Sequence, residues 1–249
     1  MAELKDIVAD IVKHTATNFI EHVKITDSSE ETIIETMDVD KTVIVKGKIH
    51  DPIGEIGNEI GFGNLKFLKG VLNLSNYRVD GSTVSVEHRE RNGENIPDSL
   101  LFKDVYGNTD RYRFMSKQVI DQNLKTVKFK GATWNVEIEP TKQKVSELQS
   151  AAAIYGGSDT TFQLKTDNGD LVITFGSEKS SFSGKRIFAT DVSGDYKEQY
   201  QWPLAKVLAI LDLGMSGKCK MSLSDLGVLQ ISVDSGIGQY NYILPALTA

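Results

Sequence analysis

The fold is decided by the stretch Leu65-Lys66-Phe67-Leu68-Lys69-Gly70-Val71-Leu72-Asn73-Leu74. Its leucines and Val71 recur at a spacing of three and four residues, which is typical of a helix with one buried face. The same pattern returns 139 positions later, as Leu204, Val207, Ile210, Leu211 and Leu213. A run of short alternating strands follows each copy, so the sequence predicts a duplicated helix-then-strands unit.

A second pair of helices supports the duplication. The apolar residues of one expected helix match those of another with a displacement of 141 positions: Leu4, Ile7, Ile11 and Val12 against Val145, Leu148, Ala152 and Ala153. The four expected helices cover residues 2–18, 63–74, 141–155 and 203–214.

Between the helices, runs rich in Val, Ile and Thr that end at Asp, Gly, Ser or Asn predict antiparallel strands. The expected strands are 22–26, 32–37, 42–49, 77–79, 83–89, 99–105, 110–116, 133–139, 160–166, 171–175, 182–189, 217–223, 228–233 and 240–244. Helical periodicity fades from 117 to 130, as in a connector. We therefore expect an α+β protein with a domain at 1–117, a connector at 118–131 and a second domain at 132–249.

Composition limits the class of protein. The chain has 249 residues, a net charge of −6 and one cysteine, Cys219, which excludes an intrachain disulfide framework. No apolar run is long enough to span a bilayer, and acids occupy the amino-terminal residues where a signal peptide would be basic. We expect a protein of the cytoplasm, or of the host cytoplasm if it is viral. The negative charge leaves room for a nucleic-acid-binding protein only if its positive charge is confined to one face.

Enzymatic signatures are missing from the sequence. The four histidines lack metal-ligand spacing, and there is no G-x-S-x-G motif. Asp38 with Asp40, and Asp167 with Asp170, lie in expected turns, where Asp is common. We expect neither an enzyme nor a bound cofactor or metal.

The arrangement resembles the DNA sliding clamps, the polymerase processivity factors, in their two-domain form. The resemblance rests on the four helices, the connector, and the ending Asn241-Tyr242-Ile243-Leu244-Pro245-Ala246-Leu247, in which Leu244-Pro245-Ala246 is similar to the apolar-Pro element of the family's tail. It covers nearly the whole chain but rests on architecture, because the family has no signature motif. The acidic balance and compact domains suggest a bacteriophage member.

The resemblance implies a homotrimeric ring of six similar domains, with helices lining a hole and sheets outside. The ring would encircle double-stranded DNA without sequence specificity, which requires positive charge toward phosphates. Seven lysines on the helices meet this requirement: Lys5, Lys13, Lys66, Lys69, Lys142, Lys144 and Lys206. Lysines on the polar side of a helix are also common without such a role.

The resemblance further implies two protein-binding surfaces. The edge strands 110–116 and 182–189 of neighbouring copies would pair, with contacts among Tyr112, Phe114, Phe182 and Phe188. A pocket for short peptides of the replicative DNA polymerase and the clamp loader would lie between the connector and the tail. Its expected residues are Val119, Ile120, Leu124, Pro245 and Leu247.

Two alternative functions, from other classes of protein, stay open. A phage structural or assembly ring protein, built from duplicated β-rich domains, would need no positive charge in its bore. A monomeric peptide-binding module would protect its edge strands with charge.

Overall fold

A computed structural model of the chain describes residues 2–91, 93–124, 129–155, 160–176 and 182–247. The chain divides into two compact units. Unit 1 consists of Met1–Val127 and Gly236–Tyr240, and unit 2 of Lys128–Ser235 and Asn241–Ala249. The expected connector therefore divides between the units, and its residues 125–128 lie outside the described part of the chain.

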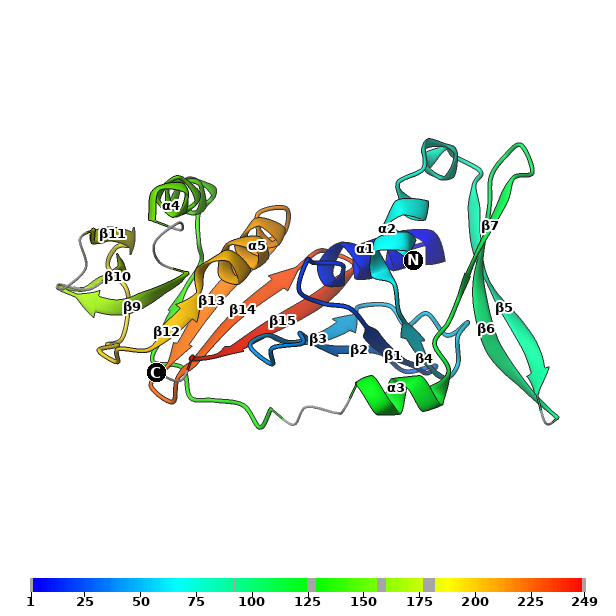
Figure 1. The fold of residues 1–249 in the computed structure, drawn as a ribbon, viewed down its shortest axis with the longest axis horizontal. Helices are drawn as coiled ribbons and strands as arrows, with labels where there is room; N and C mark the ends of the chain where they lie inside the picture. Colours follow the sequence, from blue (N-terminus) through cyan, green and yellow to red (C-terminus); the bar gives the residue numbers. More distant parts are fainter. Residues whose placement is uncertain (1, 92, 125–128, 156–159, 177–181, 248–249) are drawn as a thin grey trace. The chain divides into compact units, whose positions relative to one another are not determined.

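Unit 1 contains two helices over an antiparallel sheet and a separate three-stranded meander (Figure 1). The sheet has the order β4-β1-β2-β3, and the meander the order β5-β6-β7. The elements are α1 (Leu4–Thr15), β1 (Val23–Asp27), β2 (Thr32–Met37), β3 (Ile44–Ile49), β4 (Glu59–Phe62), α2 (Leu65–Leu72), the 3-10 helix η1 (Ser75–Arg78), β5 (Thr83–Arg91), β6 (Glu94–Lys103), β7 (Thr109–Arg113) and α3 (Lys117–Asn123).

Unit 2 repeats this plan with two helices and two sheets. One sheet has the order β11-β10-β9-β12, and in the other β15 is followed by β14, β13 and β8. The elements are β8 (Val136–Ile138), α4 (Lys142–Tyr155), β9 (Thr161–Asp167), β10 (Asp170–Phe175), β11 (Gly184–Ala189), β12 (Gln201–Pro203), α5 (Leu204–Gly214), β13 (Lys218–Ser224), β14 (Val228–Asp234) and β15 (Gly238–Pro245).

The two units share one topology, which confirms the duplication. Each runs helix, four strands, helix, three strands, and β4-β1-β2-β3 corresponds strand by strand to β12-β9-β10-β11. Registers agree as well: Ile25 pairs with Ile34 in β1–β2, and Leu164 pairs with Ile173 in β9–β10, all four side chains being buried. The equivalent residues lie 139 positions apart, the displacement that the helices show.

The start of β15 belongs to unit 1, where it borders β3. The His50 amide donates to the Ile237 carbonyl at 2.9 Å, and the Tyr240 ring lies against Gly47. In unit 1, β3 is therefore covered on the side away from β2. This feature could not be predicted from the sequence, because it joins strands almost 190 residues apart.

Several local predictions were wrong. Residues 77–79 do not form a strand: Tyr77 and Arg78 belong to η1 and Val79 follows it, because Tyr77 buries its ring in a turn closed by Ser82. The strands β4 and β12, of four and three residues, were missed because they are too short to show alternation. Helix α4 buries Val145, Leu148 and Ala151, whereas Ala152 is half-buried and Ala153 exposed.

The segment expected to be an irregular connector begins with helix α3. Ile120 of α3 is buried against Gly61 of β4, whose missing side chain makes room for it. No helix in the described part of the chain is long and apolar enough to cross a membrane.

Candidate functional site

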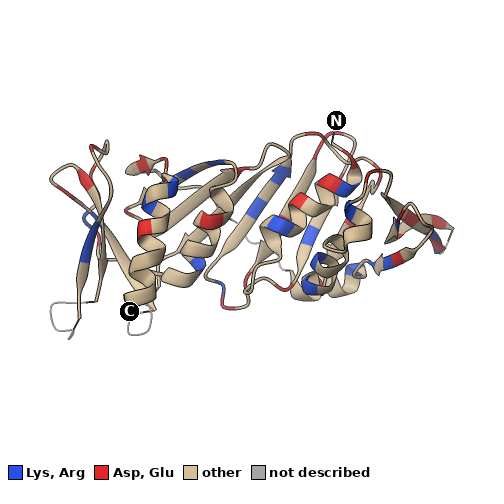
Figure 2. Cartoon of the chain, turned by 90° about the horizontal axis from the view of Figure 1, so that it is seen from above, with Lys and Arg blue, Asp and Glu red and all other residues tan. Residues whose placement is uncertain are grey.

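The helices carry a charge opposite to that of the whole chain. Helices α1, α2, α4 and α5 hold seven lysines against four acids, in a chain whose net charge is −6. One of the four acids, Asp10, is buried. Blue positions on the helices in Figure 2 mark these lysines. The excess of positive charge lies on the helix-bearing face of each unit.

In unit 1, helix α2 carries two exposed cations. This helix contains Lys66 and Lys69, both exposed, and no acid. It begins at Asn64, which has a left-handed backbone (φ 45°) and whose side chain caps the Phe67 amide. Lys69 Nζ lies 3.4 Å from the Ala16 carbonyl, at the end of α1.

The lysines of α1 differ from each other. Lys13 is exposed, whereas Lys5 is half-buried and its Nζ reaches the Ser82 carbonyl at 3.4 Å and Oγ at 3.3 Å. Lys5 is therefore held against its own unit.

In unit 2 the three predicted lysines lie on α4 and α5. Lys142 is exposed at the start of α4, and Lys206 is half-buried on α5. Lys144 is paired with Glu147 at 2.8 Å, an ion pair that lowers the pKa of Glu147. This pairing partly cancels the charge that Lys144 would offer.

The two predicted edge strands are at the edges of their sheets. β7 ends the order β5-β6-β7, and β11 ends the order β11-β10-β9-β12. However, three of the four aromatic side chains expected to join them are buried. Tyr112, Phe114 and Phe188 are 5%, 9% and 4% exposed, and the first two pack on Phe62. Only Phe182, at 70%, offers its ring to a partner, so the predicted contact among these four side chains has to be revised.

Other exposed apolar side chains flank the two edges. Eleven large hydrophobic residues are exposed in the described part of the chain, and five of them lie in or next to the two edge strands. Hydrogen bonds from Asn76 to Asp104 and from Tyr77 to Asp110 join η1 to the end of the meander. The five residues are Val105 and Tyr106 in the turn before β7, Phe182 and Ile187 at β11, and Ile154 in α4, which packs beside β11. Sequence reasoning missed all but Phe182, because exposure depends on the tertiary neighbours.

The predicted pocket residues come from both units. In unit 1, Ile120 is fully buried, whereas Val119 is exposed and Leu124 half-buried. In unit 2, Pro245 and Leu247 are half-buried. The Leu247 amide donates to the Gln201 carbonyl at 2.9 Å, so the tail continues the edge of β12.

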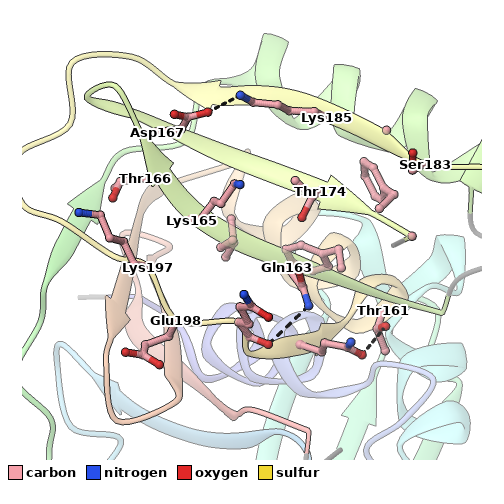
Figure 3. Close-up of a pocket in the computed structure, with 17 residues that line it drawn as sticks. Thr161, Gln163, Lys165, Thr166, Asp167, Thr174, Ser183, Lys185, Lys197 and Glu198 are labelled. Atoms are coloured by element: carbon pink, nitrogen blue, oxygen red, sulfur yellow. Dashed lines mark hydrogen bonds and ion pairs between the residues drawn. The ribbon is translucent and has the colours of Figure 1, made fainter. Parts of the chain in front are cut away.

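A polar groove of about 1240 Å³ lies on the sheet of unit 2 (Figure 3). Its lining comes from β9, β10, the start of β11 and the segment before β12. Lys185 and Asp167 form an ion pair across it that lowers the pKa of the Asp167 carboxyl. Lys165 and Lys197 also line the groove. Polar side chains therefore lie beside edge strand β11.

The described residues contain no group of three or more His, Cys, Asp or Glu side chains arranged to hold a metal ion. Cys219 is partly buried, and burial raises the pKa of its thiol to about 11. Such a thiol is almost wholly protonated at neutral pH and is a poor nucleophile.

Comparison with known proteins defines the class of fold. No family model and no curated protein matches the sequence. The structure, in contrast, has the fold of the DNA sliding clamps. It matches PCNA from Thermococcus kodakaraensis with a TM-score of 0.71 at 12% identity, covering 99% of this chain and 98% of that one.

Two further clamp structures agree. The PCNA2–PCNA3 complex from Sulfolobus tokodaii gives a TM-score of 0.67 at 11% identity, with 98% and 97% of the chains covered. The proliferating cellular nuclear antigen from Entamoeba histolytica gives 0.65 at 11% identity, with 98% and 94% covered. At these identities the likeness establishes the fold, which confirms the predicted fold class.

Proposed function

We propose that this protein is a DNA polymerase processivity factor. Copies of the chain form a closed homotrimeric ring that encircles double-stranded DNA and tethers the replicative polymerase. A clamp loader opens and closes the ring, and the chain itself catalyses no reaction. The observation that carries this proposal is the excess of lysine on the four helices of a chain that is otherwise acidic.

The charge distribution fits a protein that slides. Lysine ammonium groups attract phosphates without reading bases, so binding is independent of sequence and weakens as salt rises. The exposed Lys66, Lys69 and Lys142 are the strongest candidates for phosphate contact. We expect Lys13 and Lys206 to contribute as well. The contact of Lys5 with Ser82 and the ion pair of Lys144 with Glu147 reduce the contributions of Lys5 and Lys144.

Peptides of the polymerase and the loader bind near the connector and the tail in this proposal. Val119 and Leu124 in unit 1, and Pro245 and Leu247 in unit 2, retain exposed surface for such a peptide, whereas Ile120 is buried in unit 1. A Leu247→Asp variant tests this surface more cleanly than removal of the tail, because removal would also delete the backbone bond to Gln201.

The test is primer extension on circular DNA by the polymerase and loader of the same source. We expect Lys66→Glu/Lys69→Glu to shorten products at least tenfold, because each reversal replaces attraction of phosphates by repulsion. The control is Lys165→Glu/Lys218→Glu, which changes net charge equally at exposed strand positions. Equal shortening by both variants, or by neither, would contradict the role of the helices.

A further inference from the structure

Of the helices α1, α2, α4 and α5, three follow a short strand that covers a sheet edge of the same unit. β4 precedes α2 and pairs with β1, β8 precedes α4 and pairs with β13, and β12 precedes α5 and pairs with β9, each time antiparallel. Helix α1 is the exception, because no strand precedes it in the described residues. By the shared topology, a strand before α1 would pair with β5, as β8 does with β13. In the described part of the chain, β5 has no neighbour on that side.

The three covering strands are short, yet each adds apolar side chains to the core. β8 and β12 have three residues each, and β4 has four. Their buried side chains are Val136 and Ile138 in β8, Trp202 in β12, and Ile60 and Phe62 in β4. A covering strand therefore closes the core of its unit as well as pairing with a sheet edge.

Strand register identifies which residues of β5 face the core. Val84 pairs with Phe102 of β6, which is fully buried. Val86 pairs with Leu100, which is also fully buried. Because directly opposed residues of an antiparallel pair lie on the same face, both valines belong to the core side of the meander. Both are nevertheless only half-buried.

The equivalent residues of unit 2 are fully buried. Met221 and Leu223 of β13 pair with buried residues of β14, as the two valines of β5 do with buried residues of β6. They are 2% and 1% exposed. On the other side of β13 they pair with Ile138 and Val136 of β8. The difference in burial between β13 and β5 thus coincides with the presence of a covering strand.

We propose that the open edge of β5 binds an extended segment of a partner protein, which pairs antiparallel with residues 84–86 as β8 pairs with residues 221–223. Addition of a strand to a sheet edge is a general mode of peptide recognition, in which backbone hydrogen bonds give affinity and alternate side chains give specificity. This inference goes beyond the proposed function. It concerns unit 1 alone and does not depend on the ring.

β8 indicates the chemistry of the partner segment. Its first and last residues, Val136 and Ile138, are buried, whereas Glu137 between them is exposed. A strand that covers β5 in the same way has an apolar, a polar and an apolar residue in that order. Its two apolar side chains would lie opposite Val86 and Val84 and complete the core there.

The middle residue of the partner segment should be uncharged. In β8 this residue is Glu137, whose carboxylate pairs with Lys220 of β13 at 2.7 Å, and this pair lowers the pKa of Glu137. Thr83 takes the place of Lys220 in β5, so β5 offers no cation at that position. Glu87, on the same face of β5, would repel a carboxylate. A hydroxyl or amide side chain fits this position better.

A peptide tests the edge directly. The probe is a fluorescein-labelled peptide that copies residues 133–139 with Thr in place of Glu137, and fluorescence anisotropy measures its binding to the full chain. We expect saturable binding with a dissociation constant of about 0.1–1 mM, since the contact consists of a few backbone hydrogen bonds and two apolar side chains. A control peptide with Ser in place of both Val136 and Ile138 should bind at least tenfold more weakly.

Two lysine variants of β5 add the same charge on opposite faces of the strand. Val86→Lys places it on the core-facing side of the edge and should weaken peptide binding at least tenfold, because inward-pointing charge opposes the addition of a strand. Ser85→Lys places it on the exposed side and should leave binding within about threefold of the wild type. Far-ultraviolet circular dichroism checks that both variants fold.

Hydrogen exchange of the wild type, with and without the peptide, locates the site. Slower exchange across β5 supports the proposal and decides the question even if Val86→Lys does not fold. No binding, equal binding of the two peptides, or slower exchange confined to β7, β11 or β13 overturns it. Slower exchange of β5 when the wild type alone is concentrated would identify a second copy as the occupant and also overturn it. The mass of the wild type without peptide tests the ring separately.

Discussion

At the scale of single residues, burial of His14 changes the pH at which its ring is protonated. Its ring is fully buried on α1 and stacks on Tyr240 with ring centroids 4.2 Å apart. Tyr240 donates a hydrogen bond to Asp10 at 2.8 Å, and Asp10 lies 3.7 Å from His14. Burial lowers the pKa of His14 from 6.5 to about 4, because desolvation and nearby Lys13 outweigh the attraction of Asp10.

This shift predicts that acid destabilises the protein through His14. Between pH 6.5 and about 4 the unfolded chain binds a proton that the folded chain does not, so the free energy of unfolding falls as pH falls through this window. The full loss is about 3 kcal/mol. The measurement is urea unfolding at pH 7.5 and pH 4.5. His14→Phe keeps a stacked ring without the titration and should lose less stability on acidification; an equal loss would contradict the prediction.

No sequence pattern distinguishes His14 from an exposed histidine in the last turn of a helix. Its position, seven residues after Ile7, falls on the apolar face, but its partner Tyr240 lies 226 residues away. The same limit applies to Tyr112 and Phe114. The family resemblance implied an interface role for them, and only the packing against Phe62 reveals that they belong to the core of their own unit.

At the scale of elements, two glycines with opposite surroundings test the packing. Gly47 in β3 has no room for a side chain, because a Cβ would meet the Tyr240 ring at 2.9 Å. Gly70 in α2 is exposed, and a Cβ there would meet nothing within 4 Å.

We expect Gly47→Ala to lower the free energy of unfolding by about 1–3 kcal/mol, the usual effect of overpacking a core. Gly70→Ala should raise it by about 0.5–1 kcal/mol, since alanine restricts the unfolded chain and favours the helix. Equilibrium urea denaturation measures both. A Gly47→Ala variant that is as stable as the wild type, or more stable, would contradict the contact of β3 with Tyr240.

Elements with strong periodicity were predictable, and short ones were not. Five apolar positions in each helix were enough to predict α2 and α5, and both ends of β2 were predicted at the correct residue. In contrast β4 and β12 exist because β1 and β9 supply hydrogen bonds along their edges. Neither has enough residues to show a pattern of its own, so no reading of local sequence finds them.

At the scale of the whole molecule, the sequence predicted that the lysines lie on helices. It could not predict which of them are engaged by neighbouring residues. Lys5 and Lys144 look equivalent to Lys66 in the sequence, yet Ser82 and Glu147 engage them. The duplication itself could be predicted from the 139-residue displacement, because corresponding helices bury the same apolar positions in the core of each unit. In the described part of the chain, β7 and β11 lack the covering strand that β3 has, and the proposed assembly builds on this difference.

This asymmetry predicts the mass of the protein in solution. A contact between two different edges of the same chain is heterologous, so it either closes into a ring or continues as a filament. A closed ring of three has a mass of about 82.5 kDa, three times the 27.5 kDa chain, and stops growing once that mass is reached. We expect light scattering over a dilution series to approach this value as a plateau. A mass that keeps rising with concentration would mean that the edges pair without closing, and a ring built on them could not hold DNA.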